Sequence, residues 1–360
     1  MRNTPGKQEN RLLKTLRQPR TIAFGSILAG LTACGQLAGG TASSPQQLTP
    51  VAAVVGTAAA PSGFSATLAV GWSGGNQHNG ITIFQGSQVI VRYAGIEFPT
   101  WLASNAKGEI AVAGSRPVRV FAPPYATSAP VVAPVTAQAV TFASGNLYTL
   151  GASKAGATLS ELRPPFSAKP ARTLHLRLST PLSILATGTG YLVVSSNVKS
   201  LVVSIATWAV TGTIVHGVFA SQSAADRQGD IFIADGTRVL EYSAPQYSGP
   251  PAAIAMPGTN PSAGALAVGG DGTLFACDDE SGTVDAFAYP YLTASQITQA
   301  YACVPGDTLA LDKDANLYHD SIANLTSQHI VEYPAPYSGP GYSTFVSNFA
   351  QKGRLLTVVR

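Results

Sequence analysis

A short β-type segment recurs seven times along this chain, and its spacing constrains the fold more than any other feature. Most copies carry apolar or β-branched residues and end in an aromatic or apolar side chain. The seven copies end at Phe84, Phe121, Leu162, Ser204, Tyr242, Phe287 and Tyr333. Successive ends are 37, 41, 42, 38, 45 and 46 residues apart, and roughly 40–45 residues is the length of one four-stranded propeller blade. The repeat therefore predicts a single all-β propeller and leaves its chemistry open.

The blades are expected to have four strands each. In the sixth copy we place the strands near 264–269, 273–278, 283–289 and 296–302. The first copy shows only three, near 65–72, 81–84 and 88–94. The segment 355–359 is left over after the seventh copy, and pairing it with the first blade would close the ring and remove exposed sheet edges. We therefore predict seven blades, with six as the alternative if the first or the fourth copy is not a blade.

Composition supports this fold and excludes some functions. Charged residues make up 11% of the 360 residues, with 36 glycines and 25 prolines, which suits short strands joined by tight turns. Six of the 22 basic residues and one of the 18 acidic residues lie in residues 1–33. The remaining chain therefore has a net charge of −1 and lacks the basic surface that nucleic acid requires.

The N-terminal region is predicted to be an export signal. A basic segment, residues 1–20, precedes an uncharged apolar run at 21–32, which is too short to span a bilayer. The run ends in Leu31-Thr32-Ala33-Cys34-Gly35, and this motif resembles the lipobox of bacterial lipoprotein signal peptides. The resemblance implies cleavage after residue 33, lipidation of Cys34 and a membrane anchor. The alternative is an ordinary secretory signal that is cut near Ala33.

The lipobox resemblance also predicts where the protein resides. Gly35 stands where the inner-membrane retention signal of that family has aspartate, which favours the outer membrane of a bacterial cell envelope. Residues 34–62 carry no charge and are rich in small residues, so we interpret them as a flexible tether. The propeller is expected to occupy residues 63–360, outside the cytoplasm.

Polar turns, most of them containing a glycine, precede the second strand of several copies. They include 105–109, 226–230, 271–273 and 312–316. Together with the strands that follow, they resemble the NHL repeat and its relatives, among them the SMP-30 and lactonase-like group. That group holds a divalent cation in the propeller channel with acidic and asparagine ligands. The first blade here lacks an acidic residue in the strand where the group has its glutamate, so no cofactor is predicted, and a divalent cation is carried as the alternative.

A proline followed by an aromatic residue recurs after the third strand. It occurs at Pro124-Tyr125, Pro165-Phe166, Pro245 with Tyr247, Pro290-Tyr291 and Pro336-Tyr337. Its occurrence at one register in most blades favours a rigid turn whose ring packs between neighbouring blades. The alternative is a proline-rich ligand for another domain.

The loops after the second strand all fall on one face, where we place the candidate ligand site. The candidate residues are His78, Arg116, Asp235, Asp278, Asp279, His319 and Asp320. Convergence of His78, Asp278 and His319 at the central funnel would bind a metal ion or a polar ligand. For each residue the alternative is a solvated loop position.

Two cysteines remain after lipidation, Cys277 and Cys303. The strand assignment puts them at the ends of the second and fourth strands of one blade, about 10 Å apart. A disulfide needs Cα atoms within about 7 Å, so buried free thiols are expected. The bridge is the alternative if the chain bends back at Cys303. No CxxC pair is present, so the sequence does not indicate a thiolate zinc site.

Catalytic signatures are missing from the sequence. Asp312-Lys313-Asp314 resembles the start of a calcium loop, but Leu317 and Ala323 replace the required glycine and glutamate, so we predict a turn. There is no GxSxG elbow, phosphate loop or dinucleotide fingerprint. We expect a monomeric, lipid-anchored binding module for a protein or glycan. The alternatives are an SMP-30-like metal-dependent hydrolase and an outer-membrane assembly scaffold.

Overall fold

The structure, a computed structural model, describes most of the chain beyond residue 65. The described residues are 66–72, 79–86, 88–96, 98–153, 155–216, 223–245, 247–297, 302–323, 327–337, 341–347 and 356–359. The chain divides into two units, 1–47 and 48–360, and all described residues belong to the second. The predicted signal peptide, Cys34, the whole of the predicted tether and His78 lie outside the described residues.

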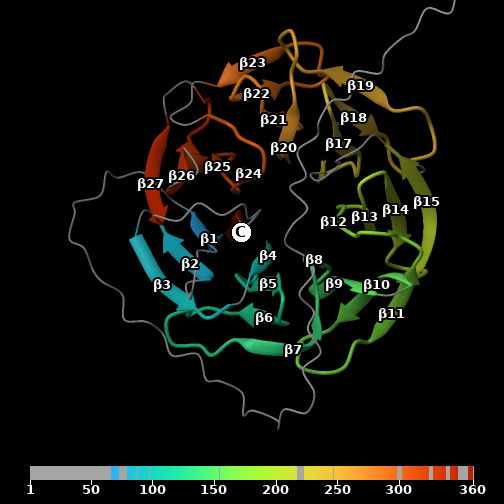
Figure 1. The fold of residues 1–360 in the computed structure, drawn as a ribbon, viewed down its shortest axis with the longest axis vertical. Coiled ribbons are helices and arrows are strands. Elements are labelled where there is room, and N and C mark those ends of the chain that lie inside the picture. Colours follow the sequence, from blue (N-terminus) through green and yellow to red (C-terminus); the bar gives the residue numbers. More distant parts are fainter. Residues whose placement is uncertain are drawn as a thin grey trace, which may run out of the picture. The chain divides into compact units, whose positions relative to one another are not determined.

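The described strands form seven four-stranded antiparallel sheets, which are the blades of a β-propeller (Figure 1). Strands are given from the centre outwards. Blade 1 contains β28 (Leu356–Val359), β1 (Thr67–Trp72), β2 (Gly80–Gln85) and β3 (Gln88–Ala94). Blade 2 contains β4 (Pro99–Ser104), β5 (Ile110–Gly114), β6 (Pro117–Phe121) and β7 (Val131–Thr136). Blade 3 contains β8 (Ala139–Ala143), β9 (Asn146–Ser153), β10 (Gly156–Leu162) and β11 (Arg172–Leu176).

The remaining four blades follow in chain order. Blade 4 contains β12 (Ser183–Ala186), β13 (Tyr191–Ser195), β14 (Lys199–Ser204) and β15 (Ala209–Val215). Blade 5 contains β16 (Ser223–Ala225), β17 (Ile231–Asp235), β18 (Arg238–Tyr242) and β19 (Ala252–Ala255). Blade 6 contains β20 (Ala263–Val268), β21 (Leu274–Asp278), β22 (Thr283–Phe287) and β23 (Ala294–Ile297). Blade 7 contains β24 (Thr308–Leu311), β25 (Leu317–Ala323), β26 (Ser327–Tyr333) and β27 (Tyr342–Ser347).

The predicted seven-bladed architecture is confirmed, and so is the closure of the ring. The recurring segment is the third strand of every blade, and β28 supplies the innermost strand of blade 1 by pairing with β1, with Val358 opposite Leu68. The Ser104 hydroxyl of blade 2 donates a hydrogen bond to the Val358 carbonyl oxygen at 2.6 Å. The last described strand is therefore held by both of the first two blades.

The core lies between adjacent blades, which explains why the middle strands are apolar on both faces. Side chains alternate along a strand, so Ile231 and Ile233 of β17 pack in a cluster with blade 4. Phe232 and Ala234 of the same strand pack with blade 6. Both faces of β17 are buried, and the strand appears in the sequence as a continuous apolar run.

The proline–aromatic turn is structural, as predicted. The ring of Tyr291 packs on Phe232 of the preceding blade with centroids 5.5 Å apart, and Tyr247 and Tyr337 make the same kind of contact. The Tyr247 hydroxyl donates to the Gly229 carbonyl oxygen at 2.9 Å. Equivalent bonds from Tyr291 and Tyr337 reach Gly272 and Ala315. Each ring therefore ties the turn after the third strand to the turn before the second strand, and also contacts the neighbouring blade.

The polar turns before the second strands are held by their first residue. The Asp312 carboxylate accepts hydrogen bonds from the backbone N–H groups of Asp314 and Asn316, both at 2.9 Å. Asp226 and Asp271 accept backbone N–H groups in the same way. Residues 312–316 therefore form the β24–β25 turn, as the sequence predicts. Among the described residues no helix is long and apolar enough to cross a membrane.

Candidate functional site

A hollow of about 960 Å³ lies where the innermost strands of five consecutive blades end and turn into the second strands. We call this side of the propeller the AB face, and the side that carries the turns between second and third strands the BC face. The lining includes Leu185 and Thr187 of blade 4, Arg227 of blade 5, Gly270 of blade 6 and Lys313 of blade 7. A volume of this size is within the range of small-molecule sites. The two faces lie at opposite ends of the strands, so the hollow is opposite the predicted ligand face.

The acidic residues of the hollow already accept hydrogen bonds within their own turns. The Asp226 carboxylate accepts the Asp230 N–H at 2.8 Å, and Asp271 accepts both the N–H and the hydroxyl of Thr273 at 3.0 Å. Burial raises the pKa of Asp226. Because these oxygens already accept hydrogen bonds, they hold the shape of the hollow and add little free acceptor capacity to it.

Two exposed basic side chains contribute positive charge to the hollow. The Arg227 guanidinium lies directly over Gly270 of the next blade, where a Cβ atom would collide with it. The Lys313 ammonium contacts the Asp314 carboxylate at 2.7 Å, and both side chains are mostly exposed. The lining also includes three aspartates of the turns, Asp226, Asp271 and Asp312, whose negative charges offset the two cations. The hollow is therefore polar and close to neutral.

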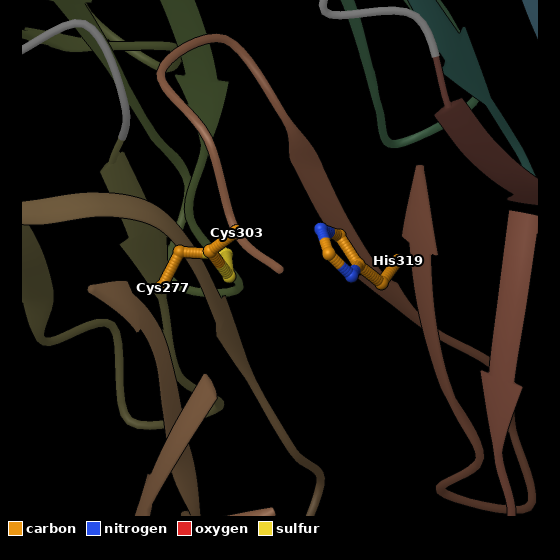
Figure 2. Close-up of side chains that lie close together, drawn as sticks. All are labelled: Cys277, Cys303 and His319. Atoms are coloured by element: carbon orange, nitrogen blue, oxygen red, sulfur yellow. A yellow bond between two sulfur atoms is a disulfide. The ribbon is translucent and has the colours of Figure 1, made fainter. Parts of the chain in front are cut away.

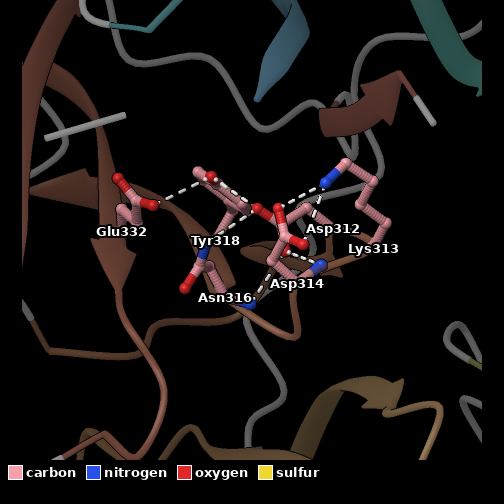
Figure 3. A network of polar contacts seen from close by, with 6 residues as sticks. All are labelled: Asp312, Lys313, Asp314, Asn316, Tyr318 and Glu332. Atoms are coloured by element: carbon pink, nitrogen blue, oxygen red, sulfur yellow. Dashed lines mark hydrogen bonds and ion pairs between the residues drawn. The ribbon is translucent and has the colours of Figure 1, made fainter. Parts of the chain in front are cut away.

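A buried network supports the blade 7 side of the hollow (Figure 3). The Tyr318 hydroxyl lies 3.1 Å from Asp312 Oδ2 and 3.0 Å from Glu332 Oε1. Burial raises the pKa of Glu332 to about 7. One hydroxyl carries one proton, so both contacts are satisfied when Glu332 is protonated and donates to Tyr318, which then donates to Asp312. The buried Tyr318 hydroxyl thereby holds the carboxylate of the lining residue Asp312 in place.

The predicted residues of the BC face are mostly engaged in local structure. Arg238 Nη2 lies 3.2 Å from Asp235 Oδ2 across the β17–β18 turn. Asp278 accepts the Ser262 N–H at 2.8 Å and the Ser281 hydroxyl at 2.7 Å. Burial opposes ionisation of Asp278, but these hydrogen bonds outweigh it, and its pKa is lowered. Arg116 lies in the β5–β6 turn, and Asp279 follows β21 and donates its N–H to the Ser262 carbonyl oxygen at 2.8 Å.

His319 and Asp320 do not lie in a loop, which corrects the sequence-based placement. Both are inside β25, which runs to Ala323 and is longer than the equivalent strands β17 and β21. Both side chains are buried. His319 Nε2 lies 2.7 Å from Asp307 Oδ2, and the Gln328 side-chain amide donates to both Asp320 oxygens, at 2.9 and 3.0 Å. The two residues belong to the interior of blade 7.

Cys277 and Cys303 form a disulfide in the structure, with Cα atoms 5.7 Å apart (Figure 2). The expected separation of about 10 Å and the expected free thiols are therefore wrong. Cys303 lies beyond β23, in the connection to blade 7, and its N–H donates to the Gly282 carbonyl oxygen at 3.0 Å. This bond draws the connection back over the β21–β22 turn, which a straight fourth strand would not do.

Asp285 is a buried carboxylate that sequence reasoning missed. It is 0% exposed, and neither oxygen has a hydrogen-bond partner within the part of the chain that the structure describes. Burial, aided by the charge of Asp278, raises its pKa to about 6. Its position inside a strand of otherwise apolar pattern gave no signal of this environment.

A second cavity, of about 480 Å³, lies between blades 4 and 5 and is lined by His216, Asp235 and Arg238 among others. His216 Nε2 is 3.0 Å from the Ser200 hydroxyl, which is 2.7 Å from the Ser195 hydroxyl. Ser200 is 0% exposed, so this serine–histidine pair connects β13, β14 and the end of β15 inside the blade. Its arrangement does not present a nucleophile to the cavity.

Comparison with known proteins identifies the fold alone. No protein-family model matches the chain, and no curated protein matches it in sequence. A solved structure of a functionally unknown protein from Desulfotomaculum acetoxidans is 13% identical, with a TM-score of 0.63, and covers 82% of this chain and 99% of its own. A protein from Lactobacillus plantarum is 14% identical, with a TM-score of 0.56, and covers 82% and 99%. A streptogramin B lyase is 10% identical, with a TM-score of 0.56, and covers 72% and 93%.

Proposed function

We propose that this chain is a binding module whose ligand site is the hollow on the AB face. The observation that carries the proposal is the construction of the hollow, because turns from five consecutive blades contribute to one cavity of about 960 Å³. A site built on the ends of strands is held by the blade packing beneath it. The same residues include no arrangement of nucleophile and base, so recognition is the function that this geometry supports best.

The ligand that fits the lining is a neutral, hydroxyl-rich glycan. Charges of both signs are spread around the hollow, so it does not favour a strongly charged ligand. Apolar side chains such as Phe142, Leu185 and Val268 are available to the apolar faces of sugar rings. The exposed Arg227 guanidinium offers hydrogen-bond donors beside the glycine-rich backbone of the turns. A peptide segment is the other ligand class to include in the test.

We further propose that the module works outside the cytoplasm, tethered to a bacterial membrane through lipid on Cys34. The support is the lipobox-like motif 31–34, the basic and apolar segments before it and the uncharged segment after it. The absence of an aspartate at position 35 favours the outer membrane as the site of anchoring. Lipid analysis of the chain and of a Cys34→Ser variant tests this: the wild-type protein should incorporate labelled fatty acid, and the variant should not.

Binding is tested by thermal unfolding of the full chain in the presence of a panel of neutral oligosaccharides and peptides. A ligand at a hundredfold excess over Kd stabilises the folded state by about 2.7 kcal/mol. We expect a glycan to raise the Tm and Arg227→Ala to weaken its binding about tenfold, which corresponds to about 1.4 kcal/mol. Arg238→Ala is the matched control, because Arg238 lies on the BC face, paired with Asp235.

The same assay separates the alternatives. A glycan that binds Arg227→Ala as well as wild type would place recognition elsewhere and contradict the proposed site. Stabilisation by peptides alone would assign a protein-binding role. Calcium or manganese, added separately, would raise the Tm if the SMP-30-like alternative, with a cation in the channel, were correct. The scaffold alternative predicts a protein partner that is recovered with the tethered chain.

A further inference from the structure

Three potential metal ligands from separate parts of the sequence meet at the boundary of blades 6 and 7. One ligand atom each of Cys277, Cys303 and His319 lies within 4.8 Å of the others, and all three residues are buried. Within the described part of the chain this is the one place where three or more histidine, cysteine or acidic ligand atoms converge. Figure 2 shows the His319 ring directed toward the two cysteines, which are joined as a disulfide.

The environment of His319 prepares one ring nitrogen as a ligand. Nε2 lies 2.7 Å from Asp307 Oδ2, and both side chains are 0% exposed. A carboxylate at this distance favours the tautomer with the proton on Nε2, which leaves a lone pair on Nδ1. Nδ1 is buried and has no hydrogen-bond partner among the residues that the structure describes. Metal-binding histidines typically donate their other N–H to a carboxylate in this way.

We propose that Cys277, Cys303 and His319 form a redox-gated zinc site, closed by the disulfide and opened by its reduction. A dithiol reductant transfers two electrons and two protons to the disulfide, which yields two thiols, while the dithiol becomes a disulfide. Zinc then binds both sulfurs and His319 Nδ1, and the two thiol protons are released. Asp307 is the positioning residue that orients the imidazole. The oxidised and zinc-bound forms exclude each other, because the same two sulfurs serve both.

The geometry requires only a small local movement. Zinc–sulfur bonds of about 2.3 Å and zinc–nitrogen bonds of about 2.0 Å place tetrahedral ligands roughly 3.5 Å apart. The two sulfurs and one ring nitrogen of His319 already lie within 4.8 Å of one another. Cys303 lies in a connection outside the strands, so it can shift once the sulfur–sulfur bond is broken. Two thiolates and an imidazole suit zinc better than calcium or magnesium, and one water would complete four-coordination.

Zinc binding to the full chain carrying Cys34→Ser tests the proposal, because Cys277 and Cys303 are then its only cysteines. The protein is dialysed against zinc with or without a phosphine reductant, and bound metal is measured by mass spectrometry. We expect about one zinc per reduced chain and none per oxidised chain. Cobalt substitution should give a thiolate charge-transfer band and the visible bands of a tetrahedral site.

Two variants distinguish the site from non-specific thiol binding. His319→Gln keeps both thiols and should lose zinc binding, whereas Asp307→Asn should weaken it about 10- to 100-fold. His175→Ala, an exposed histidine in β11, is the matched control and should bind like wild type. Circular dichroism establishes that each reduced variant is folded. The proposal is overturned if folded His319→Gln binds as much zinc as the parent chain. It is also overturned if the reduced parent chain binds no zinc, or if it unfolds on reduction and zinc does not restore its fold.

Discussion

At the residue scale, the tyrosine hydroxyls of the proline–aromatic turns are the contacts whose energy is easiest to isolate. The Tyr247 ring is buried and its hydroxyl bonds the Gly229 carbonyl oxygen at 2.9 Å. We expect Tyr247→Phe to lower the free energy of unfolding by about 1–2 kcal/mol, because a buried carbonyl loses its partner while the packing of the ring is kept. Urea unfolding measures the change. Blade 3 carries phenylalanine, Phe166, at the equivalent position, so the fold tolerates a blade without this bond.

A matched control separates the hydrogen bond from a general effect of removing a hydroxyl. Tyr289 is 75% exposed, so Tyr289→Phe should change the free energy of unfolding by less than about 0.5 kcal/mol. If the two variants were equally stable, the hydroxyl of Tyr247 would exchange its bond with water at no cost. The turns would then be held by ring packing alone.

Residue-scale reasoning from the sequence identified the turns better than the site. Asp226, Asp271 and Asp312 mark turns because a short carboxylate followed by small or polar residues can accept nearby N–H groups. The same residues line the hollow only because five blades bring their turns together, and no local pattern encodes that arrangement. Nothing in the sequence distinguished Arg227 from the other residues of its turn. Its role depends on Gly270, more than forty positions away, which leaves room for the guanidinium.

At the scale of elements, β28 closes the ring, and its removal is expected to be severe. Leu356 and Val358 are buried, and the strand pairs with β1 over four residues. Deleting residues 356–360 removes about 1.5–3 kcal/mol of burial per apolar side chain and exposes the edge of β1 to other chains. We expect loss of cooperative unfolding or a fall in stability of several kcal/mol, accompanied by aggregation, measured by urea unfolding and light scattering.

The control for this truncation keeps the strand and alters one side chain. Thr357 points a hydroxyl at Ser104, 3.0 Å away, and Thr357→Ala should cost about 1 kcal/mol or less. A truncated chain as stable and monomeric as Thr357→Ala would show that three strands suffice for blade 1. Ring closure by β28 would then have no energetic role.

Element prediction succeeded where a repeat reinforced it and failed where one blade departs from the others. Strand order and the closing strand followed from a period near 41 residues and one unassigned apolar segment. The length of β25 could not be predicted in this way. His319 and Asp320 are polar residues that follow Leu317 and Tyr318, and two consecutive polar residues suggest that the strand has ended and a loop has begun. The disulfide was only the alternative prediction, since an ideal outer strand leaves Cys303 too far from Cys277, and it forms because the chain bends back at Cys303. A polar pair in a strand is stable here because Asp307 and Gln328 supply partners.

At the scale of the whole molecule, buried carboxyl groups are expected to make stability depend on pH. Burial raises the pKa of Asp320 to about 8, and the charge of Asp307 adds to this effect, while hydrogen bonds from Gln328 oppose it. Asp285 and Glu332 are shifted in the same direction, to about 6 and about 7. Unfolded carboxyl groups have pKa values near 4. Between roughly pH 4 and pH 8 the folded chain therefore binds protons that the unfolded chain has released, and stability falls as the pH rises.

Asp320→Asn isolates the largest of these contributions. The amide is close in shape to a protonated carboxyl group and does not titrate, so the variant lacks the cost of ionising residue 320 in the folded state. The free energy of unfolding of wild type minus that of Asp320→Asn should fall by on the order of 2–4 kcal/mol from about pH 5 to about pH 8, because one pKa unit corresponds to about 1.4 kcal/mol. The difference should level off above the folded pKa.

Asp314→Asn is the control, since its side chain is 53% exposed and should give a difference that is nearly independent of pH in this range. A constant difference for Asp320→Asn as well would mean that Asp320 is ionised in the folded protein, with Gln328 providing enough stabilisation of the charge. The pH dependence would then have to arise from Asp285 in blade 6 and from Glu332 in β26 of blade 7.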